Sequence, residues 1–183
     1  WGLNSKFRAS QSDPMRMYYG DFDENGKSET ILAIEKGGVY YPLDGLDMIA
    51  SQIPALKKKF TSYQAFAGKA IQKIFSEEQL AKAMMFEVHE LASGYLKNND
   101  GNFVFEQLPF DLQISPIMAQ LKYDFNSDGK DEVLLGGNYF GVQPFHGRYG
   151  SFRGAIIRNE NKIIDGKALG LQLINHSVRH FNI

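Results

Sequence analysis

Two acidic segments constrain the fold more than any other part of the sequence. They read DFDENGKSE at residues 21–29 and DFNSDGKDE at residues 124–132. Each has an oxygen-bearing side chain at positions 1, 3 and 5, a glycine at position 6 and a glutamate at position 9. Side chains at alternate positions converge on one point only if the backbone curls tightly. Gly26 and Gly129 stand where that curl needs a residue without a Cβ.

The two segments predict two calcium sites, because Ca²⁺ takes about six to eight oxygen ligands from carboxylates, carbonyls and water. The expected ligands of the first are the side chains of Asp21, Asp23, Asn25 and Glu29 and the backbone carbonyl of Lys27. Those of the second are the side chains of Asp124, Asn126, Asp128 and Glu132 and the carbonyl of Lys130. Mg²⁺ fits less well because it keeps several waters.

A polar turn between two strands is the alternative interpretation of each segment. Because the same residue types recur at the same positions of both segments, we favour metal sites over polar turns. Neither segment is an EF-hand loop, which needs a glutamate at position 12 and flanking helices. Position 12 is Leu32 in one segment and Leu135 in the other, and strand-like residues flank both.

The order of hydrophobic residues predicts a mainly β fold with one α-helical insertion. Strands are expected at residues 15–19, 30–36 and 39–41, with a hairpin turn at Gly37-Gly38. From residue 44 to residue 83 the apolar spacing becomes helical, and after it the spacing of strands returns. We therefore expect a single domain over residues 1–183 with a helical insertion at 44–83.

Three helices are expected in the insertion. The apolar spacing is carried by Leu46, Ile49 and Ile53 in the first helix and by Phe66, Ala70 and Ile74 in the second. Ser76 and Gln79 form a capping box that starts a third, short helix. The later strands are expected at 86–91, 95–96, 103–105, 117–123, 133–135, 154–158, 162–164 and 177–182.

Composition excludes several classes of partner and chemistry. The net charge is −1, so the overall charge of the chain does not attract nucleic acid or an anionic membrane. It has no cysteine, which excludes disulfides and thiol catalysis, and no apolar run long enough for a transmembrane helix. The chain opens at Trp1 without a Met start, so we interpret it as a piece of a larger protein.

The sequence does not predict an enzyme. His89-Glu90 begins like a zinc-protease motif, but the second histidine is missing, because Ser93 stands in its place. Residues 138–152 are rich in aromatic residues and glycines. They either bind a sugar or peptide, with Arg148 and Tyr149 in contact with it, or fold back as a structural plug that includes Phe145, and we favour the plug.

The acidic segments between strands resemble the calcium loop of FG-GAP repeats, as in the integrin alpha-chain β-propeller. More specifically, the chain resembles FG-GAP/VCBS repeat proteins of the ASPIC/UnbV-associated type, familiar from Bacteroidetes surface proteins. The resembling segments are WGLNSKFRAS, YYGDFDENGKSE, YYPLDGLDMIASQIPALKKKF, FEQLPFDLQISPI and LLGGNYFGVQPFHGRYG, which span residues 1 to about 150. The resemblance weakens over the last 30 residues or so, and it supplies no catalytic residue.

The resemblance implies a β-propeller of which this chain holds only part, the remaining blades belonging to a larger parent chain. It also implies calcium binding and a location in the cell envelope, at the cell surface or outside the cell. The expected function is therefore a calcium-binding, β-propeller-type binding or adhesion module with a protein or glycan ligand. The alternative is a carbohydrate-binding or substrate-docking module of a polysaccharide-handling surface system.

Overall fold

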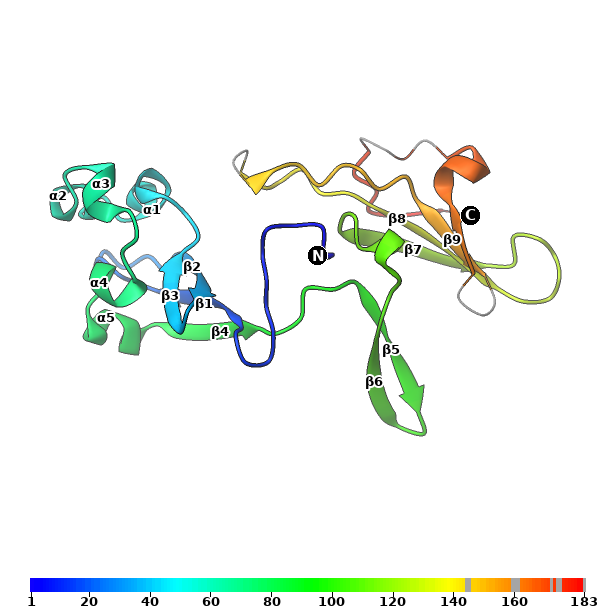
Figure 1. Cartoon of the computed structure of the whole chain (residues 1–183), viewed down its shortest axis with the longest axis horizontal. Coiled ribbons are helices and arrows are strands. Elements are labelled where there is room, and N and C mark those ends of the chain that lie inside the picture. The colour runs from blue at the N-terminus through cyan, green and yellow to red at the C-terminus, as the bar shows by residue number, and fades with distance from the viewer. Residues whose placement is uncertain (144–145, 159–161, 172, 174–175, 183) are drawn as a thin grey trace. The chain divides into compact units, whose positions relative to one another are not determined.

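The computed structural model describes residues 1–143, 146–158, 162–171, 173 and 176–182 (Figure 1). The chain is mainly β, as predicted, with three antiparallel sheets and one helical region. Its contacts divide into two compact units. We call Phe7–Glu90 the first-loop unit, and Trp1–Lys6 together with Leu91–Ile183 the second-loop unit. That the chain behaves as one domain stays a prediction.

The first-loop unit contains a four-stranded antiparallel sheet in the order β3-β2-β1-β4. Its strands are β1 (Met15–Gly20), β2 (Glu29–Lys36), β3 (Val39–Pro42) and β4 (Met84–Val88). The expected turn at Gly37-Gly38 is confirmed, with φ of 63° and 80° at the two glycines. β4 returns beside β1 only after the helical insertion, which gives the sheet the strand order of a Greek key.

The helical insertion lies between β3 and β4, grouped beside the sheet in Figure 1. Its helices are α1 (Leu46–Gln52), α2 (Leu56–Lys59), α3 (Tyr63–Phe66), α4 (Ile71–Ile74) and α5 (Glu77–Lys82). The capping box of Ser76 and Gln79 is confirmed at the start of α5. The continuous helix expected from Phe66 to Ile74 is wrong, because Gly68 takes a left-handed φ of 69° and separates α3 from α4.

The core of the first-loop unit joins the sheet to the insertion. Ile31 and Ala33 of β2 pack in one cluster with the buried apolar residues of the helices, and all are less than a tenth exposed. The members of this cluster that come from the insertion are Leu46, Ile49, Ala50, Ile53, Leu56, Phe60, Phe66, Ile71, Ile74 and Phe75. The insertion therefore covers the sheet as part of one core.

The second-loop unit contains the other two sheets. Strands β7 (Ile117–Tyr123), β8 (Glu132–Gly137), β9 (Ala155–Arg158) and β10 (Lys162–Asp165) form a sheet in the order β10-β9-β8-β7. Strands β5 (Gly94–Asn99) and β6 (Asn102–Gln107) form a two-stranded sheet. The short 3₁₀ helices η1 (Phe110–Leu112) and η4 (Gly166–Leu169) complete the named elements.

The strand expected at residues 177–182 is wrong. Residues 177–182 do not form a strand. Their contacts instead run to the end of β8, where the Val178 N–H donates to the Gly137 carbonyl at 2.8 Å. Phe181 and Val178 fill the space beside Gly136, where a Cβ would lie 2.6 Å from the Phe181 ring. The segment is thus held by side-chain packing and by single hydrogen bonds rather than by a ladder of backbone hydrogen bonds.

The described helices contain none that is both long and apolar enough to cross a membrane. The described strands form no closed propeller, so the propeller stays a prediction.

Candidate metal centre

The two acidic segments occupy the same place in two β-hairpins. The first loop, Asp21–Glu29, joins β1 to β2, and the second loop, Asp124–Glu132, joins β7 to β8. Gly20 pairs with Glu29 at the base of the first loop, and Tyr123 pairs with Glu132 at the base of the second. Each loop therefore begins and ends at a pair of neighbouring strands, as the sequence predicts.

In the first loop, backbone N–H groups hold the curl closed. Asp21 accepts from the N–H of Asn25 at 3.0 Å with Oδ1 and from the N–H of Gly26 at 2.8 Å with Oδ2. The amide oxygen of Asn25 accepts from the N–H of Lys27 at 2.8 Å. Glu24 and Gly26 both have left-handed φ, 58° and 85°. The expected need for glycine at position 6 is confirmed here.

The second loop repeats this arrangement position by position. Asp124 accepts from the N–H groups of Asp128 and Gly129 at 3.1 Å and 2.9 Å. Asp128 accepts from the N–H of Lys130 at 2.9 Å. Ser127 and Gly129 are left-handed, with φ of 57° and 83°. The two segments thus form the same loop despite their different side chains at positions 3, 4, 5 and 8.

The glutamate at position 9 closes each loop from inside. Glu29 accepts from the N–H of Phe22 at 2.9 Å, and Glu132 accepts from the N–H of Phe125 at 2.9 Å. Both carboxylates are buried, with exposed fractions of 5% and 2%. The phenylalanine at position 2 was not among the expected site residues. Its signal was present, because both segments read Asp-Phe at their start.

The first loop brings three carboxylates together. One oxygen each from Asp21, Asp23 and Glu29 lie within 4.8 Å of one another. The Oδ1 atom of Asp23 is buried and has no hydrogen-bond partner. Among the described residues, no ion pair reaches any of the three. Because a buried carboxylate oxygen needs a donor or a cation, this donor set fits a hard metal ion. Ligation by Asn25 and by the Lys27 carbonyl stays a prediction.

Burial raises the pKa of Glu29 above its ordinary value. The N–H of Phe22 opposes this shift, whereas the negative charges of Asp23 and Asp21 add to it. The folded state therefore holds the Glu29 proton more tightly than the unfolded state does. Its contribution to stability is complete below the unfolded pKa and is lost as pH rises through the folded pKa. At neutral pH, without a cation, the ionised Glu29 disfavours folding.

Replacing Glu29 by glutamine should remove this pH dependence. The amide of Glu29→Gln keeps an oxygen for the Phe22 N–H but carries no charge. In chelator, we expect wild type to lose melting temperature relative to Glu29→Gln between pH 4.5 and pH 7, measured by thermal unfolding. Glu77→Gln on the exposed face of α5 is the control and should track wild type. If the melting temperature of wild type instead rises relative to that of Glu29→Gln over this pH range, the interpretation is wrong.

The second loop differs at its centre. Asn126 stands where the first loop has Asp23, and its amide nitrogen donates to Asp128 at 2.9 Å and to Glu132 at 2.8 Å. The Nε atom of Arg158, on β9, lies 3.6 Å from Glu132 Oε1. Within the described residues, only the first loop gathers three carboxylates as closely as 4.8 Å. Calcium at the second loop stays a prediction, and Arg158 had no signal in the sequence.

The helical insertion holds the first loop in place. The Phe22 ring is 2% exposed and lies 4.5 Å from the ring of Phe75, measured between centroids. The side-chain amide of Gln79 on α5 donates to the Phe22 carbonyl at 2.6 Å. On the far side of the loop, Gln52 of α1 accepts from the N–H of Thr30 at 3.1 Å. The loop is therefore hydrogen-bonded to α5, and the strand that follows it is hydrogen-bonded to α1.

The aromatic segment at residues 138–152 is partly buried. Tyr149 and Phe152 are 6% and 4% exposed, whereas Phe140 is 38% exposed and lies under the guanidinium of Arg148 at 4.6 Å. Phe145 lies outside the described residues. The two buried rings agree with a structural plug over that part of the segment.

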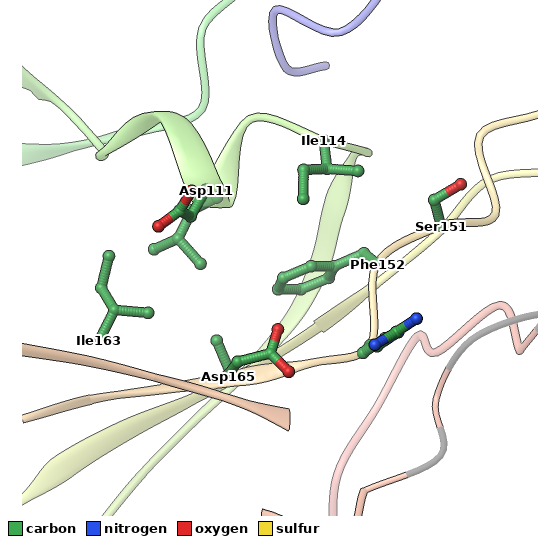
Figure 2. A pocket seen from close by; sticks show the side chains of 9 residues that line it. Asp111, Ile114, Ser151, Phe152, Ile163 and Asp165 are labelled. Carbon is green, nitrogen blue, oxygen red and sulfur yellow. The ribbon is translucent and has the colours of Figure 1, made fainter. Parts of the chain in front are cut away.

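A pocket of about 380 Å³ lies in the second-loop unit (Figure 2). Its lining includes the buried side chains of Leu112 and Phe152 and the exposed residues Asp111 and Asp165. Asp165 already accepts from the N–H of Lys167 at 2.8 Å as the cap of η4. No pattern in the sequence indicated this pocket.

The chemistry available at the first loop is the binding of a cation by oxygen donors at the junction of two strands. Such a centre stabilises a loop and fixes the strand ends that it joins. Any functional conclusion depends on this geometry, since no protein-family model, no curated protein and no solved structure matches the chain.

Proposed function

We propose that this protein is a calcium-binding module in which the ion at the first loop fixes the β1–β2 hairpin to the helical insertion. The observation that carries the proposal is the convergence of Asp21, Asp23 and Glu29 around an unpartnered, buried Asp23 oxygen. Three carboxylates without a cation repel one another, so the ion supplies the missing charge. Its role is structural, and the module presents a surface to a ligand rather than performing a reaction.

The larger architecture that we propose is part of a β-propeller of FG-GAP type, in a protein of the cell surface or cell envelope. The four strands β7 to β10 support it, because they pair in sequence order as an antiparallel sheet, the form of a propeller blade. The Greek-key order of β1 to β4 is a departure from that form. The function that follows from this architecture is binding or adhesion, with a protein or glycan as ligand.

The carbohydrate-binding alternative depends on the aromatic segment at residues 138–152. Two of its described rings, Tyr149 and Phe152, are buried, whereas Phe140 and Arg148 form an exposed pair. The calcium-stabilised module has the stronger support, because its donors converge within one loop.

Calcium should raise the melting temperature of the chelator-treated protein. Loops on extracellular modules bind Ca²⁺ with a Kd of about 10⁻⁴–10⁻³ M. At millimolar calcium one such site stabilises the fold by about 1 kcal/mol, which corresponds to about 2–4 °C. Asp23→Ala should abolish the rise from the first loop, because it removes one of the three converging carboxylates. The substitution breaks no hydrogen bond of Asp23 Oδ1, because that atom has none. Differential scanning calorimetry with and without calcium measures both effects.

The matched control is Glu24→Gln, which removes a neighbouring charge from a side chain that is 81% exposed. This variant should keep the calcium-dependent rise. A wild-type melting curve that is the same in chelator and in millimolar calcium would refute the proposed function. Equal losses in Asp23→Ala and Glu24→Gln would show that bulk charge, not a site, produces the effect.

A further inference from the structure

We propose that the two loops respond differently to calcium: the first needs the ion, whereas Asn126 and Arg158 close the second without one. The inference rests on the proposed function, since it concerns the calcium dependence of the same two loops. It follows from the contrast between two loops whose backbones are equivalent but whose centres are not. The first has an unpartnered carboxylate oxygen at position 3, and the second has a hydrogen-bond donor there.

The donor at the centre of the second loop is the amide nitrogen of Asn126. Its two partners, Asp128 Oδ2 and Glu132 Oε1, are carboxylate oxygens, which only accept. The amide oxygen faces the other way and accepts from the N–H of Asp128 at 2.9 Å. All three contacts agree on one orientation of the amide. A cation at this point would have to displace the NH₂ group and turn the amide over.

Arg158 supplies the positive charge. Glu132 is 2% exposed, and a carboxylate buried to that degree needs a charged or donating partner. The guanidinium Nε lies 3.6 Å from Glu132 Oε1, in addition to the Phe125 N–H and the Asn126 amide. One of the three carboxylates expected at the second loop, that of Glu132, is therefore already paired with a positive charge of the protein.

The sheet topology explains why the first loop lacks this partner. β9 pairs with β8 from Val133 onward, so the residue after Ile157 lies opposite the end of the second loop. β3 pairs with β2 only from Ala33 to Lys36, at the end of β2 that is farther from the first loop. The neighbouring strand thus reaches Glu132 but not Glu29.

A calcium titration followed by NMR tests the inference on the whole chain. The amide signals of Gly26 and Gly129 report the first and second loops separately, because both N–H groups are bonded to the first aspartate of their loop. In wild type, we expect the Gly26 signal to move at a calcium concentration at least about 10-fold lower than the Gly129 signal, a difference that corresponds to about 1.4 kcal/mol.

Two kinds of variant should change this order. Asn126→Asp combined with Arg158→Gln should lower the midpoint of Gly129 toward that of Gly26. Asn126→Asp alone should lower the Gly129 midpoint by a smaller amount. The single variant replaces the double variant in the test if the double variant does not fold. The reciprocal Asp23→Asn should raise the midpoint of Gly26. Lys162→Gln is the charge control, since Lys162 pairs with Arg158 across β9 and β10, and it should leave both midpoints unchanged.

The outcomes separate this inference from the proposed function. If both glycines of wild type move at one midpoint, the asymmetry is refuted and the calcium-binding function stands. If Asn126→Asp and the double variant leave the Gly129 midpoint where it was, the role of Asn126 and Arg158 is refuted. If neither signal moves in wild type or in any variant, both the inference and the proposed function are refuted.

Discussion

Replacing Phe22 by alanine is expected to lower the free energy of unfolding by about 3–5 kcal/mol, the range for a buried aromatic truncated to alanine. The Phe22 ring is 2% exposed and packs on Phe75 in the main core of the first-loop unit. Its backbone N–H donates a hydrogen bond to Glu29, and its backbone carbonyl accepts one from Gln79. Loss of the ring leaves a cavity between the first loop and Phe75, so the loop also loses its support.

The matched control is Phe125→Ala at the equivalent position of the second loop. Phe125 is 41% exposed and contacts Tyr123 edge to face at 5.3 Å. Its substitution should change the free energy of unfolding by less than about 1 kcal/mol. Urea denaturation followed by circular dichroism measures both variants. Comparable losses at the two positions would contradict the packing of the first loop against the helices.

Replacing Asn138 by alanine is expected to lower the free energy of unfolding by about 2–4 kcal/mol, because several buried backbone groups lose their partner at once. Asn138 is fully buried, and its amide nitrogen reaches the carbonyls of Phe152, Leu173 and His176 at 2.9 Å, 3.1 Å and 3.0 Å. Its amide oxygen accepts from the N–H of Phe152 at 2.9 Å. One side chain thus ties the end of β8 to two later segments.

The backbone at Asn138 allows the effect to be divided. Its φ is 75°, a left-handed conformation that asparagine tolerates and glycine adopts freely. Asn138→Gly therefore removes the side chain and its hydrogen bonds without backbone strain, whereas Asn138→Ala adds backbone strain of about 1 kcal/mol. Asn4→Ala, which removes one exposed bond to the Ile114 carbonyl, is the control and should cost less than about 1 kcal/mol. Chemical denaturation of the three variants measures these differences, and a neutral Asn138→Gly would contradict the role of the amide.

The local geometry of the loops could be predicted from the sequence because it depends on residues close to one another in the chain. Gly26 and Gly129 mark the left-handed positions, and the aspartate at position 1 of each loop accepts from N–H groups only a few residues later. The capping box at Ser76 is local in the same way. Short-range chemistry of this kind leaves a readable pattern.

The contacts that distinguish the two loops could not be predicted, because they come from strands and helices distant in the sequence. Arg158 reaches Glu132 from β9, and Gln79 reaches Phe22 from α5. The break between α3 and α4 was hidden because Phe66 and Ile74 are both buried although they belong to different helices. The role of Asn138 was hidden in the same manner, since its partners lie in the last part of the chain.

The return of β4 beside β1 has a consequence for the kinetics of folding. β1, β2 and β3 are joined by short hairpins, so their pairing closes only small loops and proceeds early. β4 can join β1 only after the insertion from α1 to α5 has been synthesised and brought back. During synthesis on the ribosome, the edge of β1 that β4 finally covers therefore stays unpaired until the whole insertion has been made. An unpaired edge is a template for pairing with another chain, so slow collapse of the insertion favours strand-swapped dimers and aggregates over the native sheet.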